Sequence, residues 1–152
     1  MSEENTQSSD DREIGLACAH LALDRKARDV KLVYVGDRLG IADWFVLATV
    51  NNRRQARAVR DAVRVGLKER GHGVPVTSSE DPEGRWSLYD YGGVVLHLFD
   101  DEGRQYFDLD SMWADVPSIL VSEEGDVDVA PGPSASESSP EVAPGINKEE
   151  TP

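Results

Sequence analysis

The chain has 152 residues, of which 39% are hydrophobic and 30% charged, so it is long enough for one compact domain with its own core. The formal charge of −13 lies mostly at the ends: residues 1–13 hold five acids and one base, residues 122–152 eight acids and one base, and the middle sixteen acids and fourteen bases. One cysteine excludes an internal disulfide, and no apolar run approaches the roughly 20 residues of a membrane span, so we expect a cytoplasmic protein with no membrane contact.

The polar, acidic N-terminus indicates neither a secretory signal nor an Arg-rich transit peptide. We expect residues 1–10 to be a disordered tail and a helix to span 11–26, because Asp10 can cap it and Glu13 follows three residues later. Apolar side chains recur in this helix at the expected spacing, at Ile14, Ala17, Cys18, Leu21 and Ala22. A buried thiol at Cys18 is therefore favoured over a nucleophile.

Two strands are predicted next along the chain. Residues 30–35 form a β-branched, partly alternating run that closes at Gly36. Residues 41–50 are almost continuously apolar, which is typical of a strand covered on both faces. We therefore place the second strand in the centre of the sheet.

A second helix is predicted over 52–70, with an asparagine N-cap before it and Gly71 after it. Its outer face carries six bases, which are Arg53, Arg54, Arg57, Arg60, Arg64 and Lys68. Such a face could meet nucleic-acid phosphates. A solvated face with intrahelical pairs such as Arg57 to Asp61 is the favoured interpretation, because no aromatic side chains are interleaved with the bases.

The second half of the chain predicts more strands and a last helix. Residues 74–77 favour a short edge strand, because proline cannot donate to a ladder. Residues 86–91 and 94–99 predict a hairpin around Gly92-Gly93. A short helix is expected over 104–113, and Pro117 marks the end of the fold.

From residue 121 onward the sequence predicts a disordered acidic tail, 121–152, rich in Pro, Ser and Glu. The folded domain is then expected over 11–120. Its predicted elements give an α+β fold with a mixed sheet flanked by helices.

The run from Trp86 to Trp113 is dense in aromatic side chains. If strands alternate faces, Trp86, Leu88 and Asp90 share one side, whereas Ser87, Tyr89 and Tyr91 share the other. Aromatic residues next to a carboxylate on an exposed sheet face are typical of a protein-binding surface. Packing in the core of a small domain is an equally good interpretation for any single one of them.

His97 could act as a catalytic base if Asp90 or Asp108 approached it. It lies mid-strand in an apolar run, however, and no serine or cysteine occupies a nucleophile turn, so a histidine bonded within the fold is favoured. The spacing of Cys and His residues matches no metal site, and the chain has no phosphate-binding glycine loop. We therefore expect no cofactor, no metal and no enzyme activity.

Four segments have an unusual joint composition: D-V-K-L-V-Y-V-G at 29–36, I-A-D-W-F-V-L-A-T at 41–49, R-R-Q-A-R-A-V-R-D-A-V at 53–63, and W-S-L-Y-D-Y-G-G-V-V-L-H-L-F at 86–99 with R-Q-Y-F-D-L-D-S-M-W at 104–113. Together they resemble the ribosomal silencing factor family, also called RsfS or Iojap. The resemblance implies a nucleotidyltransferase-like α+β fold that binds the fourteenth protein of the large ribosomal subunit. Members of this family keep the two subunits apart, and a role in large-subunit assembly is also proposed for them.

The resemblance also implies a recognition surface on this chain. Its candidate residues are Trp86, Asp90, Tyr91, His97, Arg104, Tyr106 and Trp113, with Asp43 and Asp108 in support. Trp86 and Tyr91 are the strongest candidates for direct contact. One departure concerns the hairpin turn, where Gly93 stands at the position of a common Asp. Other departures are Val50 for a common Gly, Asn52 for a common Ser and Asp110 for the usual Glu.

These observations leave several functions open. The favoured hypothesis is a translation repressor that blocks subunit joining, and a large-subunit assembly factor of the same family is an alternative. A nucleotide-handling enzyme on the related fold is a weaker one, motivated by His97, Asp90 and Asp108. Ribosomal RNA could be contacted at the periphery through the Arg53–Lys68 helix, and exposed edge strands would permit a homodimer.

Overall fold

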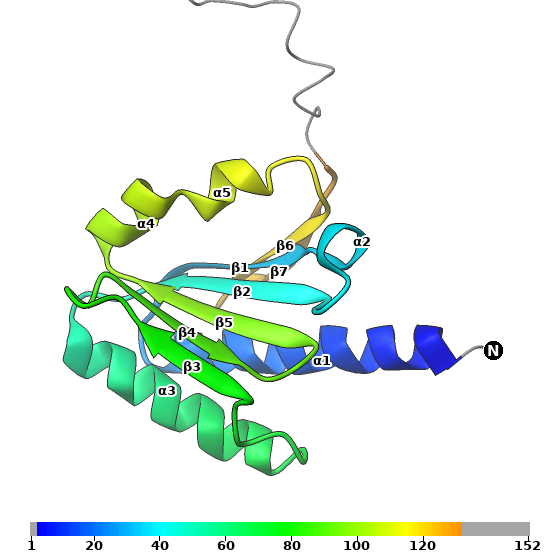
Figure 1. Cartoon of the computed structure of the whole chain (residues 1–152), viewed down its shortest axis with the longest axis horizontal. Coiled ribbons are helices and arrows are strands. Elements are labelled where there is room, and N and C mark those ends of the chain that lie inside the picture. The colour runs from blue at the N-terminus through cyan, green and yellow to red at the C-terminus, as the bar shows by residue number, and fades with distance from the viewer. Residues whose placement is uncertain (1–2, 132–152) are drawn as a thin grey trace, which may run out of the picture.

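The structure is a computed structural model, and it describes residues 3–131. Seven strands form one sheet: β1 (Arg28–Tyr34), β2 (Trp44–Thr49), β3 (Thr77–Glu80), β4 (Trp86–Asp90), β5 (Val94–Phe99), β6 (Ser118–Ser122) and β7 (Gly125–Val129). The helices are α1 (Glu3–Asp24), α2 (Gly36–Leu39), α3 (Arg53–Lys68), α4 (Asp101–Phe107) and α5 (Leu109–Met112). The predicted α+β architecture, a mixed sheet flanked by helices, is confirmed (Figure 1).

The strands lie in the order β3-β4-β5-β2-β1-β6-β7. Only β2 and β5 are parallel, and every other neighbouring pair is antiparallel. A parallel pair requires a long crossover, which here includes α3 and the first part of the β3–β4–β5 meander. The nearly continuous apolar segment does form the central strand, because β2 has three strands on each side.

Helices cover the two faces of the sheet unequally (Figure 1). The long helices α1 and α3 pack on one face, where Cys18, Ala22, Val59, Val63 and Leu67 bury their side chains against the strands. The short helices α4 and α5 lie on the other face, over a smaller cluster that includes Val33, Leu47 and Phe99. On this second face, Phe45, Trp86, Leu88 and Phe107 pack against the cluster and remain only partly buried.

Several predicted boundaries agree closely with the structure. The Asn52 side chain caps α3 by accepting a hydrogen bond from the Gln55 N–H at 2.8 Å. The β4–β5 hairpin has the predicted Gly92-Gly93 turn. The predicted edge strand at 74–77 agrees less well: β3 does lie at the edge of the sheet, but it spans Thr77–Glu80, so Pro75 is outside it.

The predicted end of the fold was wrong. Instead of a tail from 121, residues 118–129 form the β6–β7 hairpin, which pairs with β1. Two of its acids face α1, where Asp126 bonds to His20 at 3.1 Å and Asp128 pairs with Arg12 at 3.6 Å. The acidic composition of this segment suggested disorder, but two of its carboxylates pair with side chains of α1, which are far away in the sequence. Residues 132–152 of the predicted tail lie outside the described part of the chain.

Other boundaries also differ from the predictions. Helix α1 begins at Glu3, so Asp10 lies inside the helix and does not cap it. The predicted helix 104–113 is two helices, because Asp108 adopts a left-handed conformation with φ of 52° and ends α4. The short α2 was not predicted at all. Within residues 3–131, no helix combines the length and apolar character that a membrane crossing demands.

Candidate functional site

Large aromatic side chains form a surface on the sheet face that α4 and α5 only partly cover. Alternation along β4 turns Trp86 and Leu88 toward this face, and β2 contributes Phe45. Helix α4 adds Phe107, which is half-buried, and Tyr106, which is 70% exposed. We call these five residues the aromatic surface.

The rings of the aromatic surface pack against one another and against the residues beneath them. The Trp86 ring centroid lies 4.6 Å from that of Phe107 and 5.5 Å from that of Phe99. The Phe45 centroid lies 4.4 Å from the His97 ring and 5.7 Å from the Trp113 ring. Stacked, tilted and edge-on contacts of this kind hold the side chains in fixed positions before any partner arrives.

His97 lies beneath this surface and is only 2% exposed. The Trp86 Nε1–H donates a hydrogen bond to His97 Nδ1 at 3.1 Å, so the neutral ring carries its proton on Nε2. Burial lowers the pKa of His97 from 6.5 to about 3, which keeps the imidazole neutral at physiological pH. His97 therefore orients Trp86 and packs under Phe45, and its Nε2 is buried without a bonding partner in the described residues.

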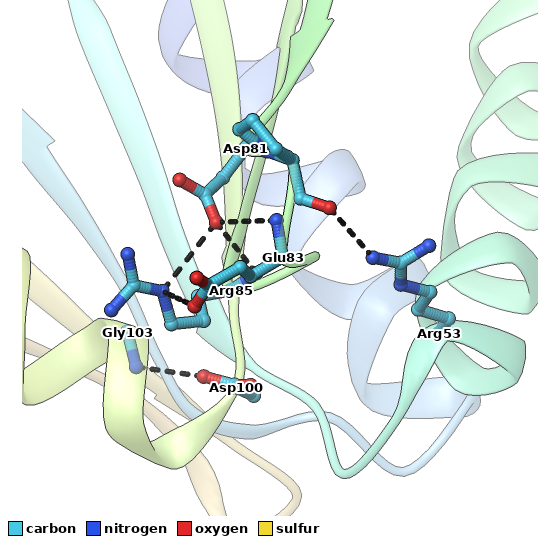
Figure 2. Close-up of polar contacts among 7 residues, drawn as sticks. Arg53, Asp81, Glu83, Arg85, Asp100 and Gly103 are labelled. Carbon is cyan, nitrogen blue, oxygen red and sulfur yellow. Dashed lines mark hydrogen bonds and ion pairs between the residues drawn. The ribbon is translucent and has the colours of Figure 1, made fainter.

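The entry to β4 is joined to α4 by a compact set of contacts (Figure 2). The Asp81 carboxylate accepts a hydrogen bond from the Glu83 N–H at 3.0 Å and lies 3.4 Å from the Arg85 guanidinium. Arg85 in turn lies over the rings of Tyr106 at 5.1 Å and Phe107 at 5.5 Å. This cation–π stack fixes the α4 aromatics next to Trp86.

A close backbone approach determines where α4 begins. The Asp100 carboxylate caps α4 by accepting from the Gly103 N–H at 2.7 Å (Figure 2). The Asp100 N–H donates to the Arg85 carbonyl at 3.2 Å. A Cβ atom at Gly103 would lie 2.1 Å from that same carbonyl oxygen. Glycine is therefore required here, and it lets α4 reach the strand that carries Trp86.

Arg104 was a predicted contact residue, but its side chain is engaged inside the protein. Its guanidinium donates to Asp110 at 2.7 and 3.0 Å and to the Thr49 hydroxyl at 2.9 Å. Lys31 adds a second ion pair to Asp110 at 2.8 Å. Burial alone would raise the pKa of Asp110, but the bonds from Arg104 and Lys31 outweigh it and hold that pKa far below the usual range. Arg104 thus ties α4 and α5 to the sheet.

Tyr91 does not lie with Trp86. Its side chain is 9% exposed and belongs to the core beneath α1 and α3, on the opposite face of the sheet. This burial raises its pKa to about 12. The alternation along β4 had already indicated opposite faces for these two residues, and the structure places Tyr91 away from the aromatic surface.

The remaining candidates have local roles in the fold. The Asp90 carboxylate accepts from the Gly92 N–H at 2.8 Å and shapes the hairpin turn. Asp43 uses its backbone to join the β1–β2 connection to Gly93, and Asp108 separates α4 from α5. Trp113 is 7% exposed and packs against Phe45, with Arg38 over its ring at 5.2 Å. The structure therefore brings together Trp86, His97, Tyr106 and Trp113 out of the predicted set.

Sequence reasoning did not single out Phe45, Arg85 or Phe107 as site residues. The enzyme hypothesis gains nothing from the geometry, because Asp90 and Asp108 bond to backbone groups and not to His97. Among residues 3–131, no three His, Cys, Asp or Glu side chains are placed to hold a metal ion.

Residues 8–149 match the family model described as ribosomal silencing factor during starvation. The chain belongs to this family. Among its relatives, the ribosomal silencing factor RsfS of Bacillus subtilis is 31% identical over 94 residues, which cover 62% of this chain and 79% of the relative. The RsfS of Chromobacterium violaceum is 33% identical over 100 residues, covering 64% and 80%.

The chain is also similar to a plant protein and to two solved structures. The chloroplastic protein Iojap of Arabidopsis thaliana is 30% identical over 106 residues, which are 70% of this chain and 44% of that protein. A crystal structure of a Chromobacterium violaceum protein superposes with a TM-score of 0.62 at 29% identity and covers 67% of this chain and 84% of the other. A Bacillus halodurans structure, with a TM-score of 0.60 at 24% identity, shares the fold.

Proposed function

We propose that this protein binds the large ribosomal subunit through the aromatic surface and blocks joining with the small subunit. The contact partner in this proposal is the fourteenth protein of the large subunit. Family membership supports association with the ribosome and a role in translation regulation. The observation that carries the proposal is the packed set of half-exposed aromatic rings around Trp86, because such side chains supply most of the binding energy at protein interfaces.

The proposed mechanism is steric and involves no chemical step. A rigid domain docked on a joining surface occupies space that the small subunit needs. The aromatic surface suits this task because its rings are already held by His97, Phe99 and Arg85, so little conformational freedom is lost on binding. His97 is a positioning residue in this proposal, because it acts through Trp86 and Phe45.

We propose that the protein acts in the cytoplasm. This proposal is supported by its similarity to bacterial proteins that are named ribosomal silencing factors. A second copy of the chain is a further proposed partner, since β3 and β7 are both exposed edge strands.

The test is sedimentation of purified large and small subunits through a sucrose gradient with and without the protein. We expect the protein to move with the large subunit and to reduce the amount of joined ribosomes. Tyr106→Ala should weaken co-sedimentation at least tenfold while leaving the fold intact, because the side chain is 70% exposed. Val76→Ala, at a position that is 73% exposed and outside the aromatic surface, is the matched control and should bind normally.

A protein that remains at the top of the gradient and leaves subunit joining unchanged would contradict the proposal. Equal weakening by Tyr106→Ala and Val76→Ala would instead exclude the aromatic surface as the binding site. Binding to immature but not to mature large subunits would favour the assembly role.

A further inference from the structure

The outer side of α3 carries a row of bases that the aromatic surface does not use. Residues Arg53, Arg57, Arg60, Arg64 and Lys68 recur every three or four positions, which confines them to an arc of about 80° and a length of about 22 Å for an ideal helix. We call these five residues the basic stripe. An amphipathic helix buries one side, here through Val59, Val63 and Leu67, and this packing holds the stripe on a rigid support.

Few acids neutralise the basic stripe. Asp61 lies 3.1 Å from Arg60 and 3.7 Å from Arg64 and is shared between them. Arg53 donates to the Pro82 carbonyl at 3.1 Å and thereby holds the loop before β4 (Figure 2). Within residues 3–131, Arg57 and Lys68 form no ion pair and no side-chain hydrogen bond. Ion pairs with acids three or four positions away would stabilise the helix and neutralise these bases, but among residues 3–131 the stripe forms one such pair, between Arg64 and Asp61.

The C-terminal end of the basic stripe opens into a hollow of about 430 Å³. It is lined by Arg64, Lys68, Gly71, His72, Gly73 and Val74, with no carboxylate among them. The chain must pass close to the helix here, because a Cβ at Gly73 would lie 2.5 Å from that of Lys68. The row of charges therefore ends in a concave basic site.

We propose that the basic stripe and this hollow bind the phosphate backbone of RNA. A regularly spaced row of cations about 22 Å long fits a polyanion whose charges repeat along a strand. The overall charge of −13 disfavours general attraction to nucleic acid, so any RNA binding must come from a local patch. Arginine is suited to such contacts, since its planar fork can donate two hydrogen bonds to one phosphate.

The position of α3 separates this activity from the proposed protein contact. Helix α3 packs on the sheet face opposite α4 and α5 (Figure 1). An RNA strand along the basic stripe and a protein on the aromatic surface would not compete for the same space. The inference thus goes beyond the proposed function, and each can fail without the other.

The test is fluorescence anisotropy of a labelled RNA hairpin of about 20 base pairs, free of ribosomal protein, titrated with the full chain at several salt concentrations. The test variant is Arg57→Gln/Arg64→Gln/Lys68→Gln. The control variant Arg12→Gln/Lys26→Gln/Arg28→Gln changes the net charge equally outside the stripe. Circular dichroism and thermal unfolding establish that both variants fold.

We expect the wild type and the control to bind RNA with similar affinity, and the test variant to bind at least tenfold more weakly at low salt. The slope of log affinity against log salt should fall by about 1 for each lost phosphate contact, hence by about 3. Trp86→Ala should bind this RNA normally. Three results would overturn the inference: no binding by the wild type at low salt, equal losses in the test and control variants, or equally tight binding of poly-glutamate, which would indicate an acidic protein partner.

Discussion

At the scale of single residues, His97 shows how a buried polar group can support a binding surface. Its Nδ1 accepts from Trp86 and its ring packs against Phe45, so one imidazole orients two members of the aromatic surface. This role depends on the neutral ring, since a protonated Nδ1 could not accept the hydrogen bond.

The low pKa of His97 predicts acid sensitivity of the fold. The unfolded chain protonates this histidine near pH 6.5, whereas the native state resists protonation down to about 3, so stability is complete above 6.5 and falls as the pH drops through this window. We expect a loss of about 2 kcal/mol between pH 7 and pH 5. Urea unfolding at both values measures it.

The matched variant for this experiment is His97→Gln. This variant should be less stable than the wild type at pH 7, because the packing of the imidazole and its hydrogen bond with Trp86 are lost. Between pH 7 and pH 5, however, its free energy of unfolding should fall by much less than the roughly 2 kcal/mol expected for the wild type. Asp110 does not confuse the comparison, because its lowered pKa affects stability only at more acidic pH. An identical pH response of the two proteins would mean that His97 is not the titrating group.

Gly93 and Asp11 form a second residue-scale relationship. The Asp11 carboxylate of α1 occupies the space beside the hairpin turn, and a Cβ at residue 93 would lie 2.1 Å from its Oδ2. An aspartate at position 93 would therefore clash with Asp11 in this chain. A carboxylate is supplied near the turn by a different element.

We predict that Gly93→Asp destabilises the protein by about 1–3 kcal/mol, because it overpacks the turn and brings two carboxylates together. In a protein that already carries Asp11→Ala, Gly93→Asp should reduce the free energy of unfolding by much less than it does in the wild type. A double-mutant cycle from urea unfolding gives the coupling energy. Additive effects of the two substitutions would rule out the close contact.

At the scale of elements, the position of α4 decides whether the aromatic surface exists. The helix brings Tyr106 and Phe107 to Trp86 only because Gly103 lets its first turn touch the Arg85 carbonyl. The left-handed residue Asp108 then redirects the chain into α5, which carries Asp110 to Arg104. The surface thus depends on contacts between segments distant in sequence.

Gly103→Ala tests this dependence. Alanine in a helix is ordinarily about 1 kcal/mol better than glycine, but here we expect a loss of at least 2 kcal/mol, because a backbone carbonyl lies in the way. Displacement of α4 should also change the tryptophan fluorescence through Trp86. Gln105→Ala, on the exposed side of the same helix, is the control and should unfold like the wild type. Stabilisation by Gly103→Ala would contradict the close approach.

The sequence predicted the elements whose signals are local. The Asn52 cap and helical apolar spacing defined α3, the Gly92-Gly93 pair defined the β4–β5 turn, and the continuous apolar run placed β2 in the centre. The β6–β7 hairpin was missed because β7 is exposed along its whole length, so no buried alternation marks it. The sequence placed Arg104 on the recognition surface and did not reveal its bonds to Asp110 and Thr49, and it did not mark Phe107, because the tertiary fold determines the contacts of both residues.

At the scale of the whole molecule, charge is distributed unevenly along the chain. Residues 132–152 hold four acids and one base, whereas the basic stripe concentrates five bases on one helix. Like charges on the tail and on RNA repel each other over distances set by the salt concentration.

We predict that a chain ending at residue 131 binds the RNA hairpin more tightly than the full chain at 50 mM salt, by about two- to fivefold. The difference should vanish near 500 mM salt, where screening is nearly complete. The same anisotropy titration measures both. Weaker binding by the shortened chain would mean that the tail assists RNA binding and does not repel it.

The order of the strands has a consequence for which parts of the molecule open first. The β6–β7 hairpin is joined to the rest of the sheet through the pairing of β6 with β1, where Val30 lies opposite Val121, and β7 is an exposed edge. Strand β7 can detach by local unfolding, whereas β6 buries Ile119 and Val121 in the core, and the parallel β2–β5 pair is released only when the whole sheet opens. Amide hydrogens of β7 should thus exchange with solvent long before those of β2 and β5, and the aromatic surface, which rests on β2, β4 and β5, would survive that opening intact.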